Sequence, residues 1–491
     1  MTEPAPAVGP TGGADPLAPY DAVLVLSYGG PAGPDDVLPF MRNATAGRGV
    51  PDSRLLEVSG HYAGFDGVSP INARNAELLD ALRAELVRRG SSAPVVIGNR
   101  NWHPFVTEAM RELADGGARR LLSLTTAAYA SYSGCRQYRE DTAAALARLA
   151  AGTDGATGEG FEVDAAARVG GAGGEPVQLV VDKTRPFYNT PGMLEANADA
   201  IADACAELTR AGVPLGGIRL VLVTHSIPVG MERGSAPHAG DGARLELRVS
   251  HSGVSAPHAG DDAPGDGSNA SGNAAAGSGS AANAPTGGRD LPAPGAAPPE
   301  PGMAPLEPGM AADLSTEISY VDQHRRFIEV LLPAVARRLG TAAAPAHDLV
   351  FCSRSGPPQA RWLEPDVNDH LEALAAGRLT DGTAVAVPDG VVVAPIGFVA
   401  DHMEVVFDLD TEARATAERF AMPCVRAATA GTHPAFIASL ADILLERAAV
   451  ARGEEVAPAS TTGTGPFHTV CPESCCRPAA SGHSARPRRP R

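Results

Sequence analysis

Short, continuously apolar segments alternate along the chain with longer amphipathic segments. Apolar runs such as AVLVLSY and RLVLVTH are typical of parallel strands that helices cover on both faces. The expected strands occupy residues 22–28, 94–98, 120–125, 177–181, 218–224, 348–352, 391–395 and 423–427. The expected helices occupy residues 71–89, 104–115, 136–150, 191–211, 318–339, 365–375, 402–420 and 434–451. This alternation predicts an α/β protein with two doubly wound, Rossmann-like domains, each built on a parallel sheet.

Three stretches interrupt the alternation. The longest has no aromatic residue, and between Pro257 and Glu300 its only large apolar residue is Leu291. Such a segment cannot bury enough apolar surface to offset its ordering entropy, so we expect it to be disordered. The predicted organisation is a disordered N-terminus (1–19), a first α/β domain (20–185), a second α/β domain (186–233 and 314–453), a low-complexity disordered insertion (234–313) and an unpacked tail (454–491). The last helix of the second domain is also compatible with packing back on the first.

Charge and composition narrow the class of protein. The 491 residues carry a formal net charge of −17, and Lys183 is the only lysine among 40 basic residues. A general nucleic-acid binder needs a basic face, so we expect no nucleic-acid partner. The chain has no run of 18 apolar residues, and its first 19 residues lack the regions of a secretory signal. We therefore expect no membrane span and a cytoplasmic location.

Polar residues follow several of the predicted strands directly. Tyr28 ends the first strand in SYGGP, His225 ends the fifth in THSIP, and Glu404 follows the strand at 391–395 in DHME. Because ligands of open α/β sheets bind beyond the carboxyl ends of the strands, these residues are candidates for a common site. A histidine and a glutamate that face each other can bind a divalent transition metal or relay protons.

Each of these residues also has a purely structural interpretation. The Gly-Gly after Tyr28 could form an ordinary turn, and His225 could be a hydrogen-bonded histidine at a strand end. Asp401 and Glu404 have the spacing of a helix capping box. Gly29-Gly30 could belong to a phosphate-binding loop, but no GxGxxG or GKS/T pattern follows them, so the evidence for a nucleotide site is weak.

The seven cysteines are unevenly distributed. Cys471, Cys475 and Cys476 lie within six residues near the end of the chain. Three thiolates need one more for a four-cysteine iron–sulfur site, and Cys135 is the best fourth donor because it begins a helix at the predicted sheet edge. Zinc is the competing metal. The remaining three cysteines have no expected role beyond packing.

Seven segments, spread in order over nearly all of the predicted core, give the chain a resemblance to a known family. They are LVLSYGGPAGPDDVLPF (24–40), GHYAGFDGVSPIN (60–72), IGNRNWHPF (97–105), YSGCRQYRED (132–141), VTHSIP (223–228), SRSGPPQARWLEPDVNDHL (353–371) and PIGFVADHMEVVFDLD (395–410). On these segments the chain resembles the ferrochelatases, specifically the high-GC Gram-positive type of the coproporphyrin-dependent haem pathway. The resemblance implies a chelatase-like arrangement of the two domains.

The resemblance also implies roles for individual residues. His225 corresponds to the metal-insertion histidine and Glu404 to its acidic partner, so both would contact Fe²⁺. Tyr28 stands where this branch often has a tyrosine that ligates the product iron, and Ser69 and Tyr138 look like porphyrin contacts. The set Cys135, Cys471, Cys475 and Cys476 is similar to the [2Fe–2S] ligands of members with a C-terminal extension.

The function that the resemblance implies is insertion of Fe²⁺ into coproporphyrin III, which gives Fe-coproporphyrin III (coprohaem). Transient contact with neighbouring haem-pathway enzymes would fit this role. Three alternatives stay open: a protoporphyrin IX ferrochelatase, a chelatase that loads another metal into a tetrapyrrole, and a porphyrin carrier without catalysis. An intact His225 and Glu404 favour an enzyme over a carrier.

Overall fold

The structure is a computed structural model that describes residues 14–47, 49–151, 165–170, 176–234, 318–354, 360–471 and 475–476. Most of the predicted N-terminal segment, nearly all of the predicted insertion and the end of the tail lie outside the described residues. The domain boundaries expected from the sequence therefore stay a prediction.

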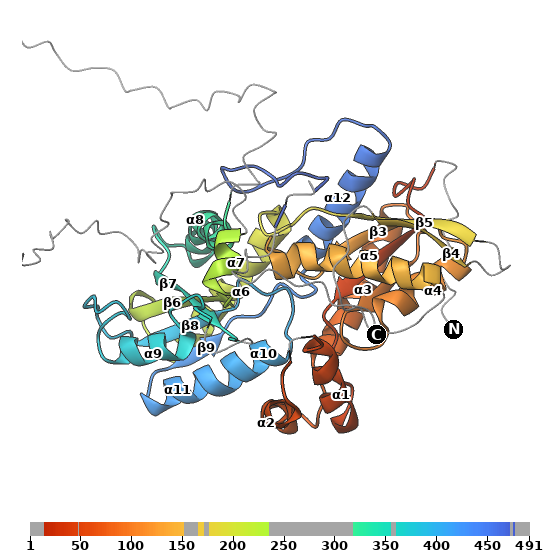
Figure 1. The fold of residues 1–491 in the computed structure, drawn as a ribbon. Helices are drawn as coiled ribbons and strands as arrows, with labels where there is room; N and C mark the ends of the chain where they lie inside the picture. The colour runs from red at the N-terminus through yellow and green to blue at the C-terminus, as the bar shows by residue number, and fades with distance from the viewer. Residues whose placement is uncertain are drawn as a thin grey trace, which may run out of the picture. The chain divides into compact units, whose positions relative to one another are not determined.

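The first sheet has five strands in the order β2-β1-β3-β5-β4 (Figure 1). Its strands are β1 (Ala22–Ser27), β2 (Val95–Asn99), β3 (Arg120–Thr125), β4 (Ala165–Gly170) and β5 (Pro176–Lys183). All neighbours are parallel except β4, which pairs antiparallel with β5. The sheet is therefore mixed, because its edge strand β4 is antiparallel. The sequence pattern predicted a fully parallel sheet and did not predict β4.

Helices cover both faces of this sheet. Alternate residues of β1 enter two different buried clusters: Val23 and Val25 face one, and Leu24 and Leu26 face the other. Residues of α3 (Ile71–Arg88) belong to the first cluster, and residues of α4 (Val106–Asp115) and α5 (Gln137–Ala151) belong to the second. Two covered faces explain why the strands are apolar throughout.

The second sheet has four parallel strands in the order β7-β6-β8-β9. They are β6 (Ile218–His225), β7 (Ala346–Cys352), β8 (Gly390–Ala394) and β9 (Cys424–Arg426). One face packs on α6 (Pro191–Arg210) and α8 (Tyr320–Leu339), and the other on α9 (Val367–Ala375) and α11 (Arg414–Arg419). Two helix-covered sheets confirm the predicted α/β class.

Several shorter or unexpected elements complete the fold. They are α1 (Pro34–Ala44), α2 (Asp52–Ala63), α7 (Val229–Gly234), a 3₁₀ turn η2 (Leu215–Gly217) and a π-helix η1 (Tyr132–Arg136). The single helix predicted at 402–420 is divided into α10 (Met403–Val405), a π-helix η4 (Val406–Ala413) and α11. π-helical turns frequently mark functional sites, and both of these adjoin candidate site residues.

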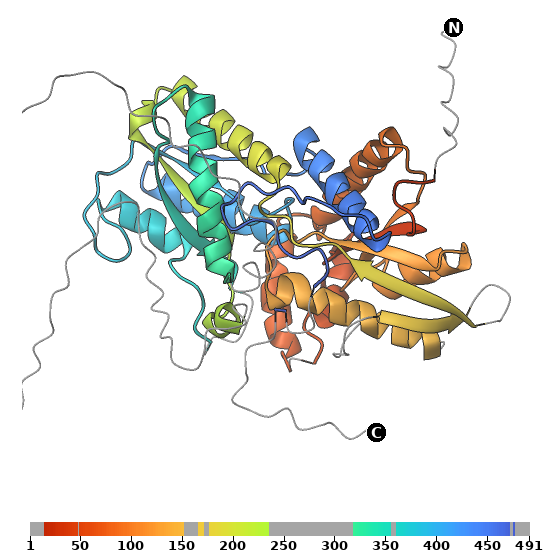
Figure 2. The same ribbon diagram turned by 90° about the horizontal axis from the view of Figure 1, so that it is seen from above.

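The last helix, α12 (Pro434–Ala451), packs against helices of both sheets. Arg89, just after α3, donates to the carbonyl of Ala438 at 3.0 Å, and α12 runs beside α3 in Figure 2. On the other side, a Cβ atom at Gly192 of α6 would lie 1.9 Å from the carbonyl oxygen of Ala435, so only glycine permits this approach.

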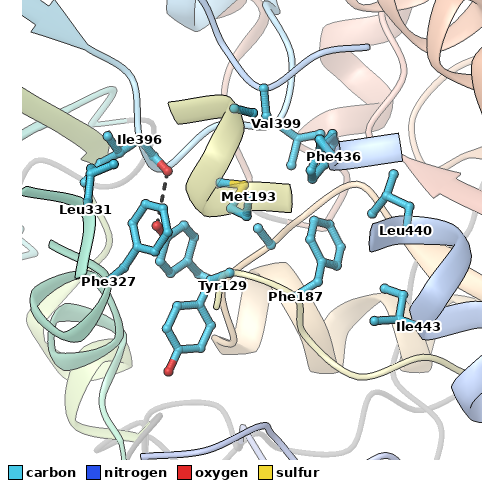
Figure 3. Close-up of a cluster of buried hydrophobic side chains, with 14 of the residues drawn as sticks. Tyr129, Phe187, Met193, Phe327, Leu331, Ile396, Val399, Phe436, Leu440 and Ile443 are labelled. Atoms are coloured by element: carbon cyan, nitrogen blue, oxygen red, sulfur yellow. Dashed lines mark hydrogen bonds between the residues drawn. The ribbon is translucent and has the colours of Figure 1, made fainter. Parts of the chain in front are cut away.

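One buried cluster joins the two sheets. Figure 3 shows Tyr129, Met193, Phe327 and Phe436 packed together, and the Tyr129 hydroxyl donates to the carbonyl of Ile396 at 3.2 Å. The loops after β3 and after β8 thus meet through a buried aromatic side chain. The carboxyl ends of the central strands of both sheets are thereby fixed to one another.

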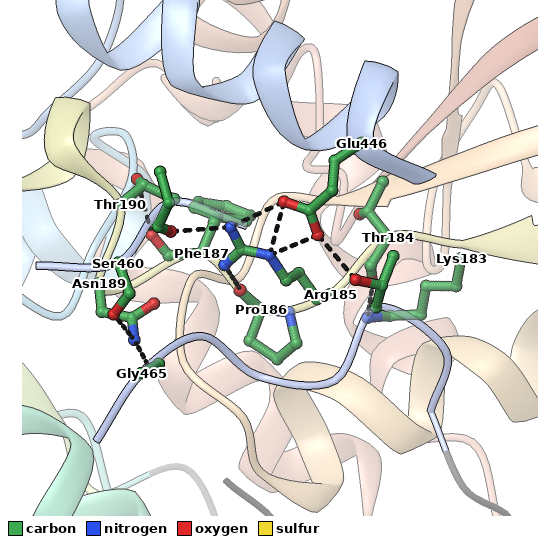
Figure 4. A network of polar contacts seen from close by, with 12 residues as sticks. Lys183, Thr184, Arg185, Pro186, Phe187, Asn189, Thr190, Glu446, Ser460 and Gly465 are labelled. Atoms are coloured by element: carbon green, nitrogen blue, oxygen red, sulfur yellow. Dashed lines mark hydrogen bonds and ion pairs between the residues drawn. The ribbon is translucent and has the colours of Figure 1, made fainter. Parts of the chain in front are cut away.

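Residues 454–471, which composition grouped with the unpacked stretches, contact the core through the buried Phe467 and through several polar side chains. The Asn189 side-chain amide donates to Ser460, Thr462 and the carbonyl of Gly465 at 2.8–3.1 Å (Figure 4). Contacts made by hydrogen bonds do not produce a periodic pattern of apolar residues, so the sequence pattern did not predict that this segment packs on the core. Within the part of the chain that the structure describes, no helix combines the length and apolarity needed to cross a membrane.

Candidate active site and thiol site

The strongest candidate pair from the sequence is brought together by adjacent strands. His225 ends β6, and Glu404 lies in α10, which follows the neighbouring strand β8. His225 Nε2 lies 3.3 Å from Glu404 Oε2, with side chains 30% and 40% exposed. His225 Nδ1 hydrogen-bonds the Ser226 carbonyl at 2.5 Å. Because a carbonyl can only accept, Nδ1 carries a proton and Nε2 is directed at the carboxylate.

The pair is electrostatically coupled. Burial lowers the pKa of His225, but the Glu404 carboxylate raises it, and the net pKa shift is upward. For Glu404, burial raises the pKa, while His225 and His402 lower it to about 2. His402 Nδ1 lies 3.9 Å from the same carboxylate oxygen, and burial lowers its own pKa. The arrangement is a carboxylate between two histidines, of which His225 more readily holds a proton.

The capping-box interpretation of Asp401 and Glu404 is wrong. The helix α10 begins after His402 without a side-chain cap. The Asp401 carboxylate accepts hydrogen bonds from Arg426 and Thr429 instead. Glu404 is thus available to His225, and the Asp401 ion pair anchors the turn that carries it.

A buried hydrogen-bond network supports the backbone of His225, and no pattern in the sequence predicted it. Thr224 Oγ1 lies 2.8 Å from both His324 Nε2 and the Tyr320 hydroxyl, and that hydroxyl also reaches the His225 carbonyl at 3.2 Å. The His324 ring stacks on Tyr129 at 3.7 Å, and burial lowers its pKa to about 3. A neutral His324 therefore helps to fix the backbone of His225.

The first turn of α8, which carries His324 and Tyr320, is hydrogen-bonded to α7, the short helix that follows His225. Both carboxylate oxygens of the buried Glu232, in α7, accept from the Val321 backbone N–H at 3.1 and 3.2 Å. This contact brings the two ends of the chain segment at 235–317 close together.

A second carboxyl group lies one turn beyond Glu404. Asp408 in η4 hydrogen-bonds Ser353, whose backbone is left-handed at φ 64°. Burial raises the pKa of Asp408 to about 7, and the Glu404 charge adds to the rise. Sequence reasoning missed Asp408 because it expected an ordinary helix here; the repeated acids in DHMEVVFDLD were the available signal.

Tyr28 lies at the end of β1 and is 45% exposed. Its ring packs edge-on against Phe40 at 6.1 Å, and Phe40 in turn contacts Tyr62 and Trp102. Burial raises the pKa of Tyr62, and the charges of Glu404 and Tyr28 add to the rise. Tyr62 therefore lies within electrostatic reach of both predicted site residues.

Ser69 and Tyr138 are both buried, at 3% and 6% exposure. Ser69 packs on the SYGGP loop, where a Cβ atom at Gly30 would lie 2.4 Å from that of Ser69. Tyr138 lies in the cluster between the first sheet and α4 and α5, with the Arg100 guanidinium 4.1 Å above its ring. Their contact with a porphyrin stays a prediction.

The four predicted cysteine ligands meet in one group. Cys135 in η1 hydrogen-bonds Cys471 and Cys476, and Cys475 hydrogen-bonds the same two, so that the thiols form a closed ring. The Cys475 and Cys476 sulfurs are 3.5 Å apart. His468 hydrogen-bonds Cys471, and the ligand atoms of His468, Cys471 and Cys475 lie within 4.8 Å of one another.

The ring of thiols fits the expected group, since four convergent sulfur donors suit an iron–sulfur cluster, and they suit zinc as well. The other three cysteines are placed elsewhere: Cys205 in α6, Cys352 at the end of β7 and Cys424 in β9. Burial raises the pKa of each of these three thiols. These three cysteines therefore lie on other elements than the four that form the ring of thiols.

Comparison with known proteins assigns this combination of fold and site to a family. The ferrochelatase family model matches residues 20–448, and the chain belongs to the ferrochelatase family. Coproporphyrin III ferrochelatase of Streptomyces coelicolor is 39% identical over 472 residues, which cover 95% of this chain and 96% of that protein. The protein of the same name from Tropheryma whipplei is 33% identical over 464 residues, with coverage of 94% and 90%.

The solved structures give a more distant likeness. SirB from Bacillus subtilis with Fe³⁺ aligns over 88% of this chain and 97% of its own, with a TM-score of 0.36 and 11% identity. That likeness is too slight to support a statement about function. The family assignment depends on the family model and the sequence relatives.

Proposed function

We propose that the protein inserts Fe²⁺ into coproporphyrin III and so produces Fe-coproporphyrin III for haem biosynthesis. The His225–Glu404 pair is the observation that carries the proposal, because metal insertion needs a proton acceptor and a metal-binding oxygen at one place. The curated relatives named coproporphyrin III ferrochelatase support this choice of porphyrin over protoporphyrin IX.

The reaction releases two pyrrole protons as Fe²⁺ enters the ring. His225 accepts protons at Nε2, since Nδ1 is committed to the Ser226 carbonyl. Glu404 stabilises the imidazolium that forms and passes the proton on. Before insertion, the same nitrogen and carboxylate replace part of the water around Fe²⁺.

Porphyrin binding supplies the remaining driving force. A flat porphyrin hides its nitrogens, and distorting the ring exposes them at a cost of roughly 1–5 kcal/mol drawn from contacts away from the reacting centre. Ser69 and Tyr138 contribute to those contacts in this proposal. Tyr28, at the end of β1, meets the iron from the face opposite His225.

The test measures binding and turnover in the same variant. His225→Ala should still bind coproporphyrin III by absorbance titration but lose anaerobic Fe²⁺ insertion. His103→Ala is the matched control, because His103 is 61% exposed and pairs only with Glu108 among the described ion pairs. Near-normal insertion by His225→Ala would refute the assignment. Protoporphyrin IX run in parallel tests the substrate, and binding without turnover in the wild type would favour a carrier.

We further propose that Cys135, Cys471, Cys475 and Cys476 hold a [2Fe–2S] cluster. When bound, this group supplies one-electron redox chemistry and a cross-link between the tail and η1. Cys476→Ser should lose the visible absorbance and the bound iron and sulfide, whereas Cys424→Ser should keep them. Zinc in place of iron and sulfide in the anaerobically purified wild type would refute the cluster.

The cellular setting follows from the same function. We propose that the protein works in the cytoplasm and contacts neighbouring haem-pathway enzymes transiently when porphyrin is transferred. Fractionation of cells with an antibody against the chain tests the location. Cross-linking with and without added coproporphyrin III tests the contacts.

A further inference from the structure

The only lysine of the chain lies beside the ring of four thiols. Lys183 is the last residue of β5 and is partly buried. Its Nζ donates to the carbonyl of Thr184 at 2.9 Å and hydrogen-bonds Cys135. Its charge also acts on Cys471 and Cys476. Lys183 therefore lies at the thiol site, and neither the iron-insertion reaction nor the set of cysteine ligands gives it a role.

The residues around Lys183 direct its charge to the sulfur atoms. The preceding Asp182 points to the opposite face of the strand, where its carboxylate binds Tyr20 and Arg120. Among the described residues, Arg136 also reaches this site: it donates to the Cys475 carbonyl at 3.4 Å and is ion-paired with Glu140 at 2.9 Å. Within the described part of the chain, Lys183 is thus a cation that hydrogen-bonds a thiol of the ring, whereas Arg136 reaches only a backbone carbonyl there.

The proposed cluster needs such a cation. Four thiolates, two sulfides and two ferric ions carry a net charge of −2, and one-electron reduction makes it −3. Burying this charge away from water is costly unless an opposite charge is close. Net charge and hydrogen bonds to the sulfurs are also the main determinants of the reduction potential of such clusters.

We propose that Lys183 is the counter-charge of the four-cysteine site, where its ammonium group stabilises the bound cluster and raises its reduction potential. The inference rests on the proposed [2Fe–2S] cluster and goes beyond it. Lysine suits the place because its ammonium is a compact charge that can donate to a carbonyl and a sulfur at once, whereas a guanidinium is a wide planar fork.

The experiment compares two variants of the full-length, cluster-loaded protein. Lys183→Met keeps the stem and removes the charge, and Lys183→Arg keeps the charge. Arg119→Met is the control, because it removes a cation whose bonds go to the Ala114 and Ala118 carbonyls, at the other end of the first sheet. Iron and sulfide content, visible absorbance and a redox titration followed by electron paramagnetic resonance are measured for each protein.

In Lys183→Met the ratio of oxidised to reduced cluster at the wild-type midpoint should rise about tenfold, a shift of about 59 mV to more negative potential. Lys183→Arg should recover most of this shift, and Arg119→Met should not shift. A cluster that assembles in Lys183→Arg but not in Lys183→Met also supports the counter-charge.

Other results overturn the inference. An unchanged potential in Lys183→Met, with full iron and sulfide, shows that the charge is not needed. Loss of the cluster in both Lys183 variants shows that the shape of lysine matters and not its charge. A wild-type protein without iron and sulfide refutes the proposed cluster itself, and the Lys183 inference with it.

Discussion

A buried ion pair ties the C-terminal segment to the first sheet, and its removal gives the most direct test of how that segment is held. Arg185 and Glu446 are only 1% and 9% exposed. Arg185 donates to both Glu446 oxygens at 2.8–3.1 Å and to the Ala459 carbonyl at 3.0 Å (Figure 4). The Thr469 hydroxyl donates to the same carboxylate at 2.8 Å, two residues before Cys471.

The change Glu446→Ala leaves the Arg185 guanidinium buried without its counter-ion. Breaking a buried pair in this way costs about 3–5 kcal/mol, because the remaining charge is not solvated. At about 1.4 kcal/mol for each factor of ten, this lowers the equilibrium constant for the docked segment by about two to three and a half orders of magnitude. The double variant Arg185→Met/Glu446→Leu should cost far less, since no charge is left unpaired.

Urea unfolding, followed by circular dichroism and by cluster absorbance, measures the effect. Glu446→Ala should lose the cluster absorbance at a lower urea concentration than the wild type, and the double variant should recover most of the difference. Glu454→Gln removes one side of the exposed Arg452–Glu454 pair and should not change either midpoint. The reasoning is refuted if Glu446→Ala unfolds within about 1 kcal/mol of the wild type, because a pair this buried cannot be that weak.

Three further predictions concern the active site and the shared core. The His225–Glu404 pair stabilises the fold over a limited pH range. Because the pKa of His225 is raised, its contribution is fully present below pH 6.5 and is lost as pH rises through the folded value. Because the pKa of Glu404 is lowered, its contribution is present above pH 4.5 and is lost as pH falls toward about 2. Glu404→Gln should therefore lower the pKa of His225, because burial is then opposed only by the Ser226 carbonyl and the Asp408 charge, and an NMR titration that gives an unchanged or higher value would contradict this. Thr224→Val removes the hydroxyl between Tyr320 and His324 and should lower kcat more than KM, and equal loss in Thr224→Ser would point to packing instead. Phe327→Ala, at a fully buried position, should destabilise the fold by about 3–5 kcal/mol in urea unfolding, and a cost below about 1 kcal/mol would show that the cluster in Figure 3 repacks freely.

The strands were predictable because two covered faces require uninterrupted apolar residues. The predicted strand at 120–125 coincides with β3, and that at 218–224 differs from β6 only by His225. β4 was missed because its sequence, AAARVG, has a single β-branched residue and pairs only at the sheet edge. α1 and α2 were missed because their apolar residues pack in a small cluster of their own.

The central site pair was predictable for a topological reason. Strand ends of a parallel sheet share an edge, so His225 and Glu404 had to lie near one another once β6 and β8 were neighbours. The network through His324 was not predictable, since its members are about a hundred residues apart and lie inside the fold. Lys183 gave one usable signal, its uniqueness in the sequence, but only the structure shows that it faces the thiols.

The Glu232–Val321 contact has a consequence for how the chain tolerates change. It joins Glu232 and Val321, which flank residues 235–317 in the sequence, so β6 and α8 are connected whatever the length of the segment between them. The entropic cost of closing a loop rises by only about 0.6 kcal/mol when its length doubles. This position is therefore a permissive insertion point: a few-residue linker or a whole foreign domain could replace the segment while His225 keeps its place.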